Sequence, residues 1–239
     1  MKKIILLLAV CGLVFSTAEA KKKKSKDSKD TVALTNETDS MSYALGVNIG
    51  TELTVSLENI PGGSYNLTPF LQGFEAAIKK EPTLMTNEYA QEYFQAYAME
   101  AYEKQNQNIK SEGEKFLAEN KKKKDVHETA SGLQYTILRD ADGAKPASET
   151  DVVKVHYEGY LLDGTKFDSS VDRGAPIDFA LNQVIRGWTE GVMLMPVGAK
   201  YKFFIPYQLA YGERGAGNAI PPYSTLVFEV ELLDINPDK

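Results

Sequence analysis

The chain alternates apolar and polar side chains along Val152-Val153-Lys154-Val155-His156-Tyr157-Glu158-Gly159-Tyr160. This period of two is typical of a strand with one face buried and the other in water. The next residues, Leu161-Leu162-Asp163-Gly164-Thr165, contain the Asp-Gly pair that favours a tight hairpin turn. A half-buried strand followed by a hairpin turn indicates an antiparallel sheet.

Three further apolar runs, on either side of this strand in the sequence, are also predicted to be strands. They are residues 133–138, 201–205 and 225–232, and Asp142-Gly143 marks another turn between the first run and the central strand. Only one short helix is needed, around residues 185–192. The pattern predicts an α+β unit over 125–239, with a curved antiparallel β-sheet wrapped on a short helix.

The preceding part of the chain, residues 39–124, has helical periodicity instead. Asp39 or Ser40 can cap a first helix, Thr68-Pro69 opens a second, and Thr86 caps a third that continues toward Lys124. A third helix of about 35 residues would be roughly 50 Å long. We therefore expect an all-helical amino-terminal domain with a long linking helix.

The third helix carries a stripe of aromatic side chains at one-turn spacing, Tyr89, Tyr93 and Tyr97. A small two-helix cap cannot cover a helix of this length, so the stripe needs either a partner chain or a satellite core formed with the first two helices. We expect a homodimer joined through residues 39–124.

The first 38 residues are predicted to be an export signal and an arm. Lys2-Lys3, an apolar run from Ile4 to Phe15, and small residues before position 21 form the three parts of a signal peptide over 1–20, cut after Ala20. A buried amino-terminal helix and a lipoprotein anchored through Cys11 are the alternatives. Residues 21–38 begin with a Lys-rich run and predict a flexible basic arm. The chain is therefore expected in the periplasm or secreted.

Charge and composition exclude several classes of function. The chain has 27 basic and 33 acidic residues, a formal charge of −6, and this argues against nucleic acid as a partner. Only two His and one Cys are present in 239 residues, which argues against a zinc site and against His- or Cys-dependent catalysis. No metal and no other cofactor is expected.

Several motifs of the carboxy-terminal half occur in the order and near the spacing of one enzyme family. They are Val155-His156-Tyr157-Glu158-Gly159, 163–170, Val184-Ile185-Arg186-Gly187-Trp188, Ala210-Tyr211-Gly212, Ile220-Pro221-Pro222 and 226–232. Across 131–235 the chain resembles the FKBP-type peptidyl-prolyl isomerases. The amino-terminal half, with Tyr43-Ala44-Leu45-Gly46, 70–74 and the long linking helix, more loosely resembles the helical dimerisation region of the Mip-like (macrophage infectivity potentiator) periplasmic branch.

The resemblance implies a proline pocket and assigns its residues. Trp188 would form the floor, and Asp168 and Tyr211 would supply the polar, catalytic contacts. The other substrate-binding positions would be Tyr157, Phe167, Ile177, Val184, Ile185, Ile220 and Phe228. At Ile177 the best-known members carry an aromatic residue, a difference that bears on substrate and drug affinity rather than on activity. Taken singly, Trp188, Phe167 and Phe228 are also typical of a hydrophobic core, and Asp168 before Ser169-Ser170 is typical of a turn or cap.

The expected function is a peptidyl-prolyl cis-trans isomerase that assists the folding of exported proteins. Rotation about an X–Pro bond makes and breaks no covalent bond, so the scarcity of His and Cys is no obstacle. The expected partners are proline-containing unfolded or partly folded exported polypeptides, and the resemblance adds a macrolide of the FK506 type as a ligand. The alternative is a holdase-type chaperone or client-binding module in which isomerase activity is secondary.

Overall fold

The computed structural model describes residues 32–60 and 62–236. The predicted signal peptide, the Lys-rich run and Cys11 lie outside these residues. The chain divides into two compact units, Met1–Thr54 and Val55–Lys239, and each is described by itself.

The first helix, α1 (Glu37–Glu58), runs from the first unit into the start of the second. The prediction that Asp39 or Ser40 caps it is wrong, because the helix begins at Glu37. The side-chain oxygen of Asn36 accepts a hydrogen bond from the backbone N–H of Asp39 at 2.9 Å. Asn is as good an N-cap as Asp or Ser, so residue type alone does not distinguish Asn36 from Asp39 and Ser40. No residue of α1 is buried.

The helices α2 (Leu67–Lys79) and α3 (Asn87–Asn120) follow in the second unit. Asn66 caps α2, and Thr86 caps α3 as predicted, accepting from the backbone N–H of Tyr89. The 34 residues of α3 confirm the predicted long helix. No residue of α2 is buried, and Leu71 and Phe74 are exposed. No helix among the described residues is long and apolar enough to cross a bilayer.

The remaining described residues contain a seven-stranded antiparallel sheet, in the order β1-β2-β6-β7-β3-β4 with β5 also paired to β3. The strands are β1 (His127–Glu128), β2 (Gln134–Arg139), β3 (Val152–Tyr160), β4 (Lys166–Ser169), β5 (Ile177–Ala180), β6 (Lys200–Ile205) and β7 (Leu226–Ile235). Along β3 every second residue is buried, as the alternating pattern predicts. The two short strands β4 and β5 share one edge of β3: β5 pairs near Val153 and β4 pairs near Gly159.

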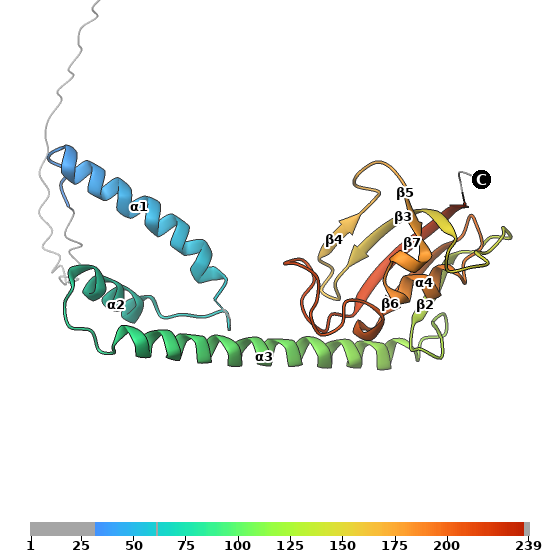
Figure 1. Cartoon of the computed structure of the whole chain (residues 1–239), viewed down its shortest axis with the longest axis horizontal. Coiled ribbons are helices and arrows are strands. Elements are labelled where there is room, and N and C mark those ends of the chain that lie inside the picture. The colour runs from blue at the N-terminus through green and yellow to red at the C-terminus, as the bar shows by residue number, and fades with distance from the viewer. Residues whose placement is uncertain (1–31, 61, 237–239) are drawn as a thin grey trace, which may run out of the picture. The chain divides into compact units, whose positions relative to one another are not determined.

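One short helix, α4 (Arg186–Val192), lies against the sheet (Figure 1). Its backbone at Gly187 and Gly191 approaches the side chains of Ile205 and Phe203 on β6. Together with Val192, these strand residues belong to the hydrophobic core, in which each fully buried aliphatic or aromatic side chain contributes about 1.5–3 kcal/mol. The predicted α+β fold, a helical amino-terminal region followed by an antiparallel sheet on a short helix, is confirmed.

Candidate active site

A cavity of about 380 Å³ opens where the sheet meets the beginning of α4. This volume is within the range of small-ligand sites, which is roughly 300–1,000 Å³. Strands β3, β4, β5 and β7, the segment leading into α4, and the segment after β6 all contribute side chains to it. The lining residues are Tyr157, Phe167, Asp168, Phe179, Gln183, Val184, Ile185, Trp188, Tyr211 and Phe228.

Trp188, the only tryptophan of the chain, is 4% exposed and is surrounded by aromatic rings. Three rings meet the indole edge to face: Tyr157 at 5.2 Å, Phe228 at 5.3 Å and Phe179 at 5.6 Å between ring centroids. Each such pair contributes about 0.5–1.5 kcal/mol beyond the area it buries. The indole Nε1 is buried and has no hydrogen-bond partner among the described residues. Ring packing therefore holds the indole in place.

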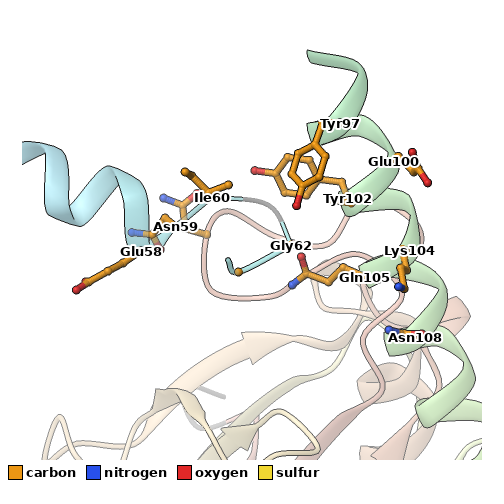
Figure 2. Close-up of a pocket in the computed structure, with 13 residues that line it drawn as sticks. Glu58, Asn59, Ile60, Gly62, Tyr97, Glu100, Tyr102, Lys104, Gln105 and Asn108 are labelled. Carbon is orange, nitrogen blue, oxygen red and sulfur yellow. The ribbon is translucent and has the colours of Figure 1, made fainter. Parts of the chain in front are cut away.

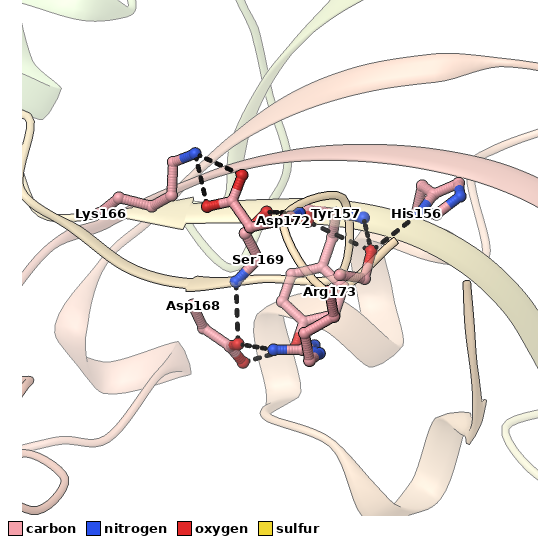
Figure 3. A network of polar contacts seen from close by, with 8 residues as sticks. His156, Tyr157, Lys166, Asp168, Ser169, Asp172 and Arg173 are labelled. Atoms are coloured by element: carbon pink, nitrogen blue, oxygen red, sulfur yellow. Dashed lines mark hydrogen bonds and ion pairs between the residues drawn. The ribbon is translucent and has the colours of Figure 1, made fainter. Parts of the chain in front are cut away.

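One side of the cavity is polar and is organised by Asp168 (Figure 3). Its carboxylate accepts hydrogen bonds from the Tyr157 hydroxyl, from the Arg173 guanidinium and from the backbone N–H of Ser169. Arg173 also donates to the Tyr157 hydroxyl oxygen at 2.9 Å. Both oxygens of Asp168 are engaged, so this side chain fixes the orientation of Tyr157 and Arg173.

These contacts determine the charge state of the polar side. Burial acts to raise the pKa of Asp168, but the hydrogen bonds from Tyr157 and Arg173 outweigh it and the pKa lies below its ordinary value. Burial raises the pKa of Tyr157, and its hydrogen bond to Asp168 raises it further. Near neutral pH, Asp168 is therefore an anion that accepts and Tyr157 is a phenol that donates.

Tyr211 contributes a second hydroxyl to the cavity. Burial raises the pKa of this phenol and the negative charge of Asp168 adds to the effect, so it too stays protonated. Among the described residues no hydrogen bond to the Tyr211 hydroxyl is found. The group is therefore available to a bound molecule.

His156 lies next to Tyr157 on β3 but has a different partner. Its Nδ1 is 3.0 Å from the Ser170 hydroxyl oxygen, which in turn accepts from the backbone N–H of Tyr157 at 2.8 Å. This arrangement holds β3 to the segment that follows β4 (Figure 3). We interpret His156 as a structural residue, in agreement with its place on the alternating strand.

The structure brings most of the residues expected in the pocket together. Eight of them line the cavity: Tyr157, Phe167, Asp168, Val184, Ile185, Trp188, Tyr211 and Phe228. Ile177 does not line it: its short branched side chain is half-buried and packs against the core. Ile220 does not line it either, because it is 6% exposed and lies within the core itself.

Three residues of the site were missed by the sequence analysis. Phe179 and Gln183 line the cavity, and Arg173 bonds to both Asp168 and Tyr157. Phe179 lies two residues after Ile177 on β5, so both side chains are on the same face of the strand, and it is Phe179 that supplies an aromatic ring beside Trp188. The signal available in the sequence was this i, i+2 spacing.

A larger hollow, of about 970 Å³, lies beside α3 and the segment after α1 (Figure 2). Most of its lining is polar, with Glu58, Asn59, Glu100 and Gln105 among its residues. The four side chains named are exposed to solvent. In the smaller cavity, aromatic rings pack around Trp188 and two hydroxyls lie beside them. The described residues that line the larger hollow form no such cluster, so the candidate site is the smaller cavity.

The geometry defines a protein that acts on an apolar group by shape and hydrogen bonding. Among the described residues no cluster of His, Cys, Asp and Glu is arranged to hold a metal ion. The cavity walls are mostly aromatic, and the polar groups are an engaged carboxylate, two phenols and the side-chain amide of Gln183. Such a site suits a small ring flanked by amide groups.

The comparisons with known proteins identify the family. Residues 143–233 match the model of the FKBP-type peptidyl-prolyl cis-trans isomerases, and residues 38–137 match the domain amino-terminal to that isomerase. The FKBP-type isomerase FkpA of Aeromonas hydrophila is 46% identical over 92% of this chain and 85% of its own. The outer membrane protein MIP of Legionella longbeachae is 33% identical over 98% of both chains.

A solved structure agrees with these relatives. The crystal structure of FkpA from Escherichia coli has a TM-score of 0.72 and 34% identity, covering 87% of this chain and all of that one. The chain therefore belongs to the FKBP-type peptidyl-prolyl cis-trans isomerases, and it is an enzyme of that activity.

Proposed function

We propose that the chain is an exported isomerase that acts on the X–Pro bonds of unfolded or partly folded polypeptides in the periplasm. The observation that supports this most directly is the aromatic cavity around Trp188, with a hydroxyl at Tyr211 that is free to bind. The proline ring occupies the cavity over the indole. The flanking amides lie against the polar side formed by Asp168, Tyr157 and Arg173.

The proposed chemistry is the stabilisation of a twisted amide. The barrier to rotation is about 18–20 kcal/mol because twisting breaks amide resonance. A twisted amide has less charge separation than a planar one, so the dry walls formed by Phe167, Phe228 and Trp188 favour it. A donor held beside it, for which Tyr211 is the candidate, adds preorganised stabilisation. A thousandfold acceleration requires about 4 kcal/mol from these effects together.

The experiment is a proline-limited refolding reaction with the protein present in catalytic amounts. We expect the wild-type chain to accelerate the slow phase, and Asp168→Ala and Phe228→Ala to lose most of that effect. The matched control is Phe74→Ala, which removes an equally large ring from α2, outside the cavity. Phe228→Ala and Phe74→Ala are both also assayed on a short X–Pro peptide, where Phe74→Ala should keep the wild-type rate. Equal loss in the control and in Phe228→Ala would contradict the assigned pocket.

We also propose the division of the chain into four parts. Residues 1–20 form the signal peptide, 21–38 a basic arm, 39–124 a dimerisation domain with its linking helix, and 125–239 the isomerase domain. The absence of any buried residue in α1 or α2 supports a homodimer through 39–124.

Cleavage after Ala20 gives a free periplasmic or secreted protein, whereas lipid attachment at Cys11 is the alternative. The mass of the purified amino-terminal peptide distinguishes the two.

A second function, as a holdase for unfolded clients, is favoured by one specific observation. The side chains of Tyr89, Tyr93, Tyr97 and Tyr102 on α3 are all exposed. The test compares residues 31–124 with 125–239 in suppressing the aggregation of an unfolded client. Protection by the first fragment supports the holdase function, and protection by the second alone contradicts it. The same pocket is proposed to bind FK506-type macrolides, with Phe179 in place of Ile177 as the aromatic residue of β5 in its wall.

A further inference from the structure

The last third of α3 is attached to the isomerase half along one face of the helix. Gly113 lies against Thr225, and the Phe116 ring packs on Phe204 of β6 with centroids 5.6 Å apart. Near the end of the helix, the buried Asn120 side chain donates to Gln134 at 3.0 Å. The helix end is therefore anchored to the same body that contains the cavity.

Lys110 is one turn before Gly113 on this face, and its contact is with two aromatic rings. Its Nζ lies 5.6 Å from the centroid of the Tyr223 ring and 5.9 Å from that of Tyr207. The two rings pack edge to face at 5.3 Å. Lys110 is half-buried and, in the described part of the chain, forms no ion pair with a carboxylate. Cation–π attraction is thus its main polar interaction.

The backbones of Tyr207 and Tyr223 form hydrogen bonds with both backbone groups of Gly212. The N–H of Gly212 donates to the carbonyl oxygen of Tyr207 at 2.9 Å, and the carbonyl oxygen of Gly212 accepts from the N–H of Tyr223 at 3.0 Å. Gly212 directly follows Tyr211, whose hydroxyl faces the cavity. A short path of contacts therefore runs from Lys110 through the tyrosine pair to the backbone beside Tyr211.

We propose that Lys110 is a positioning residue for the isomerase site. By holding the Tyr207–Tyr223 pair, it limits the movement of Gly212 and so places the Tyr211 hydroxyl for the bound substrate. The long helix thereby acts on catalysis of a short peptide, in addition to any role in assembly. This inference rests on the role proposed above for Tyr211.

The experiment uses the full chain without residues 1–20 and a short X–Pro peptide. Lys110→Met keeps the aliphatic stem and removes the charge, Lys110→Arg keeps the cation, and Lys115→Met makes the same change at an exposed position of α3. We expect Lys110→Met to raise KM about three- to fivefold, a change of the size of one cation–π contact. Lys110→Arg should restore the wild-type value, and Lys115→Met should match the wild type.

Two further readouts separate positioning from a merely structural effect. In amide NMR spectra, Lys110→Met should shift the Gly212 and Tyr223 resonances, whereas Lys115→Met should not. In a Tyr211→Phe background, Lys110→Met should have no further effect on KM. An effect that stays the same in that background, or a Lys110→Met variant that matches Lys115→Met in both KM and spectra, would overturn the proposal.

The Tyr211→Phe single variant separates the proposed role of Lys110 from the role of Tyr211 on which it rests. If Tyr211→Phe leaves catalysis unchanged, the role of Tyr211 is wrong and the inference fails with it. If Tyr211→Phe is impaired while Lys110→Met behaves as the control, only the inference from α3 is wrong.

Discussion

Gly159 lies on β3 directly beneath two rings of the cavity wall. A Cβ atom at this position would be 2.7 Å from the Phe167 ring and 2.8 Å from the Phe228 ring. Real Cβ atoms do not approach other heavy atoms so closely, so any side chain here has to displace one of the rings. The absence of a side chain at residue 159 therefore shapes the pocket.

We predict that Gly159→Ala lowers kcat/KM on an X–Pro peptide at least tenfold while reducing stability by about 1–3 kcal/mol, the usual cost of overpacking. Peptide assays and urea unfolding of the same sample check both numbers. Gly73→Ala on α2 is the matched control, since a Cβ there meets nothing within 4 Å. Full activity in Gly159→Ala would show that these rings tolerate displacement.

The ionisation of Asp168 predicts how the enzyme depends on pH. Its pKa in the folded protein lies below its ordinary value of about 3.9, so the interactions it makes are fully present above that value and are lost as pH falls through the folded pKa. The pKa values of Tyr157 and Tyr211 are raised, so neither phenol ionises until pH exceeds about 10. We predict a flat rate between about pH 5 and 9.

Arg173 is the residue that tests this explanation. Arg173→Leu removes one donor and one positive charge from Asp168, so the pKa of Asp168 should rise and the acid limb of the rate profile should move to higher pH. Arg186→Leu, on α4, is the control for charge alone. An acid limb at the same pH in both variants would mean that Asp168 does not control it.

At the scale of elements, α3 is joined to the isomerase half through a glycine that ordinary helix propensity disfavours. Gly in a helix interior costs about 1 kcal/mol relative to Ala. In α3, however, a Cβ at Gly113 would be 2.5 Å from the Thr225 hydroxyl oxygen and 3.3 Å from its Cβ. The close approach of the helix to Thr225, the residue before β7, explains a glycine that the sequence alone marks only as a weak point.

We predict that Gly113→Ala lowers the free energy of unfolding by about 1–3 kcal/mol, because the helix must move away from Thr225. The double variant Gly113→Ala/Thr225→Ala should recover part of this loss, since it removes the clashing hydroxyl. Gly73→Ala should be neutral or stabilising. Urea unfolding followed at Trp188 measures all three, and a stabilised Gly113→Ala variant would contradict the contact.

The elements that could be predicted are those with a long periodic pattern. β3 has nine residues whose burial alternates, and both of its ends were predicted. α3 has 34 residues after a Thr cap; its start was predicted, but its end, expected near Lys124, lies at Asn120. β4 and β5 have four residues each, too few for a period to be visible, and Phe179 was missed with β5. Arg173 was missed for another reason: only the turn after β4 folds its guanidinium back onto Asp168.

At the scale of the whole molecule, the two halves differ in how they bury apolar surface. The sheet and α4 enclose a continuous core, whereas no residue of α1 or α2 is buried. Exposed apolar patches beyond a few hundred Å² mark interaction sites in soluble proteins. The exposed apolar side chains include Tyr43, Leu45 and Val47 in the first unit, and Leu71 and Phe74 in the second.

This surface predicts a dimer that can be separated from catalysis. Light scattering on the chain without residues 1–20 should give twice the monomer mass at micromolar concentration. Leu71→Glu or Phe74→Glu places a charge on the apolar stripe of α2 and should give the monomer mass, while Gln72→Glu adds the same charge off the stripe and should leave the dimer intact. The rate on a short X–Pro peptide should stay the same in all of these variants, because the cavity is built from residues 157–228 of one chain. A monomeric wild-type chain would contradict the dimer, and the exposed side chains of α1 and α2 would then remain available to unfolded clients, as the holdase function requires.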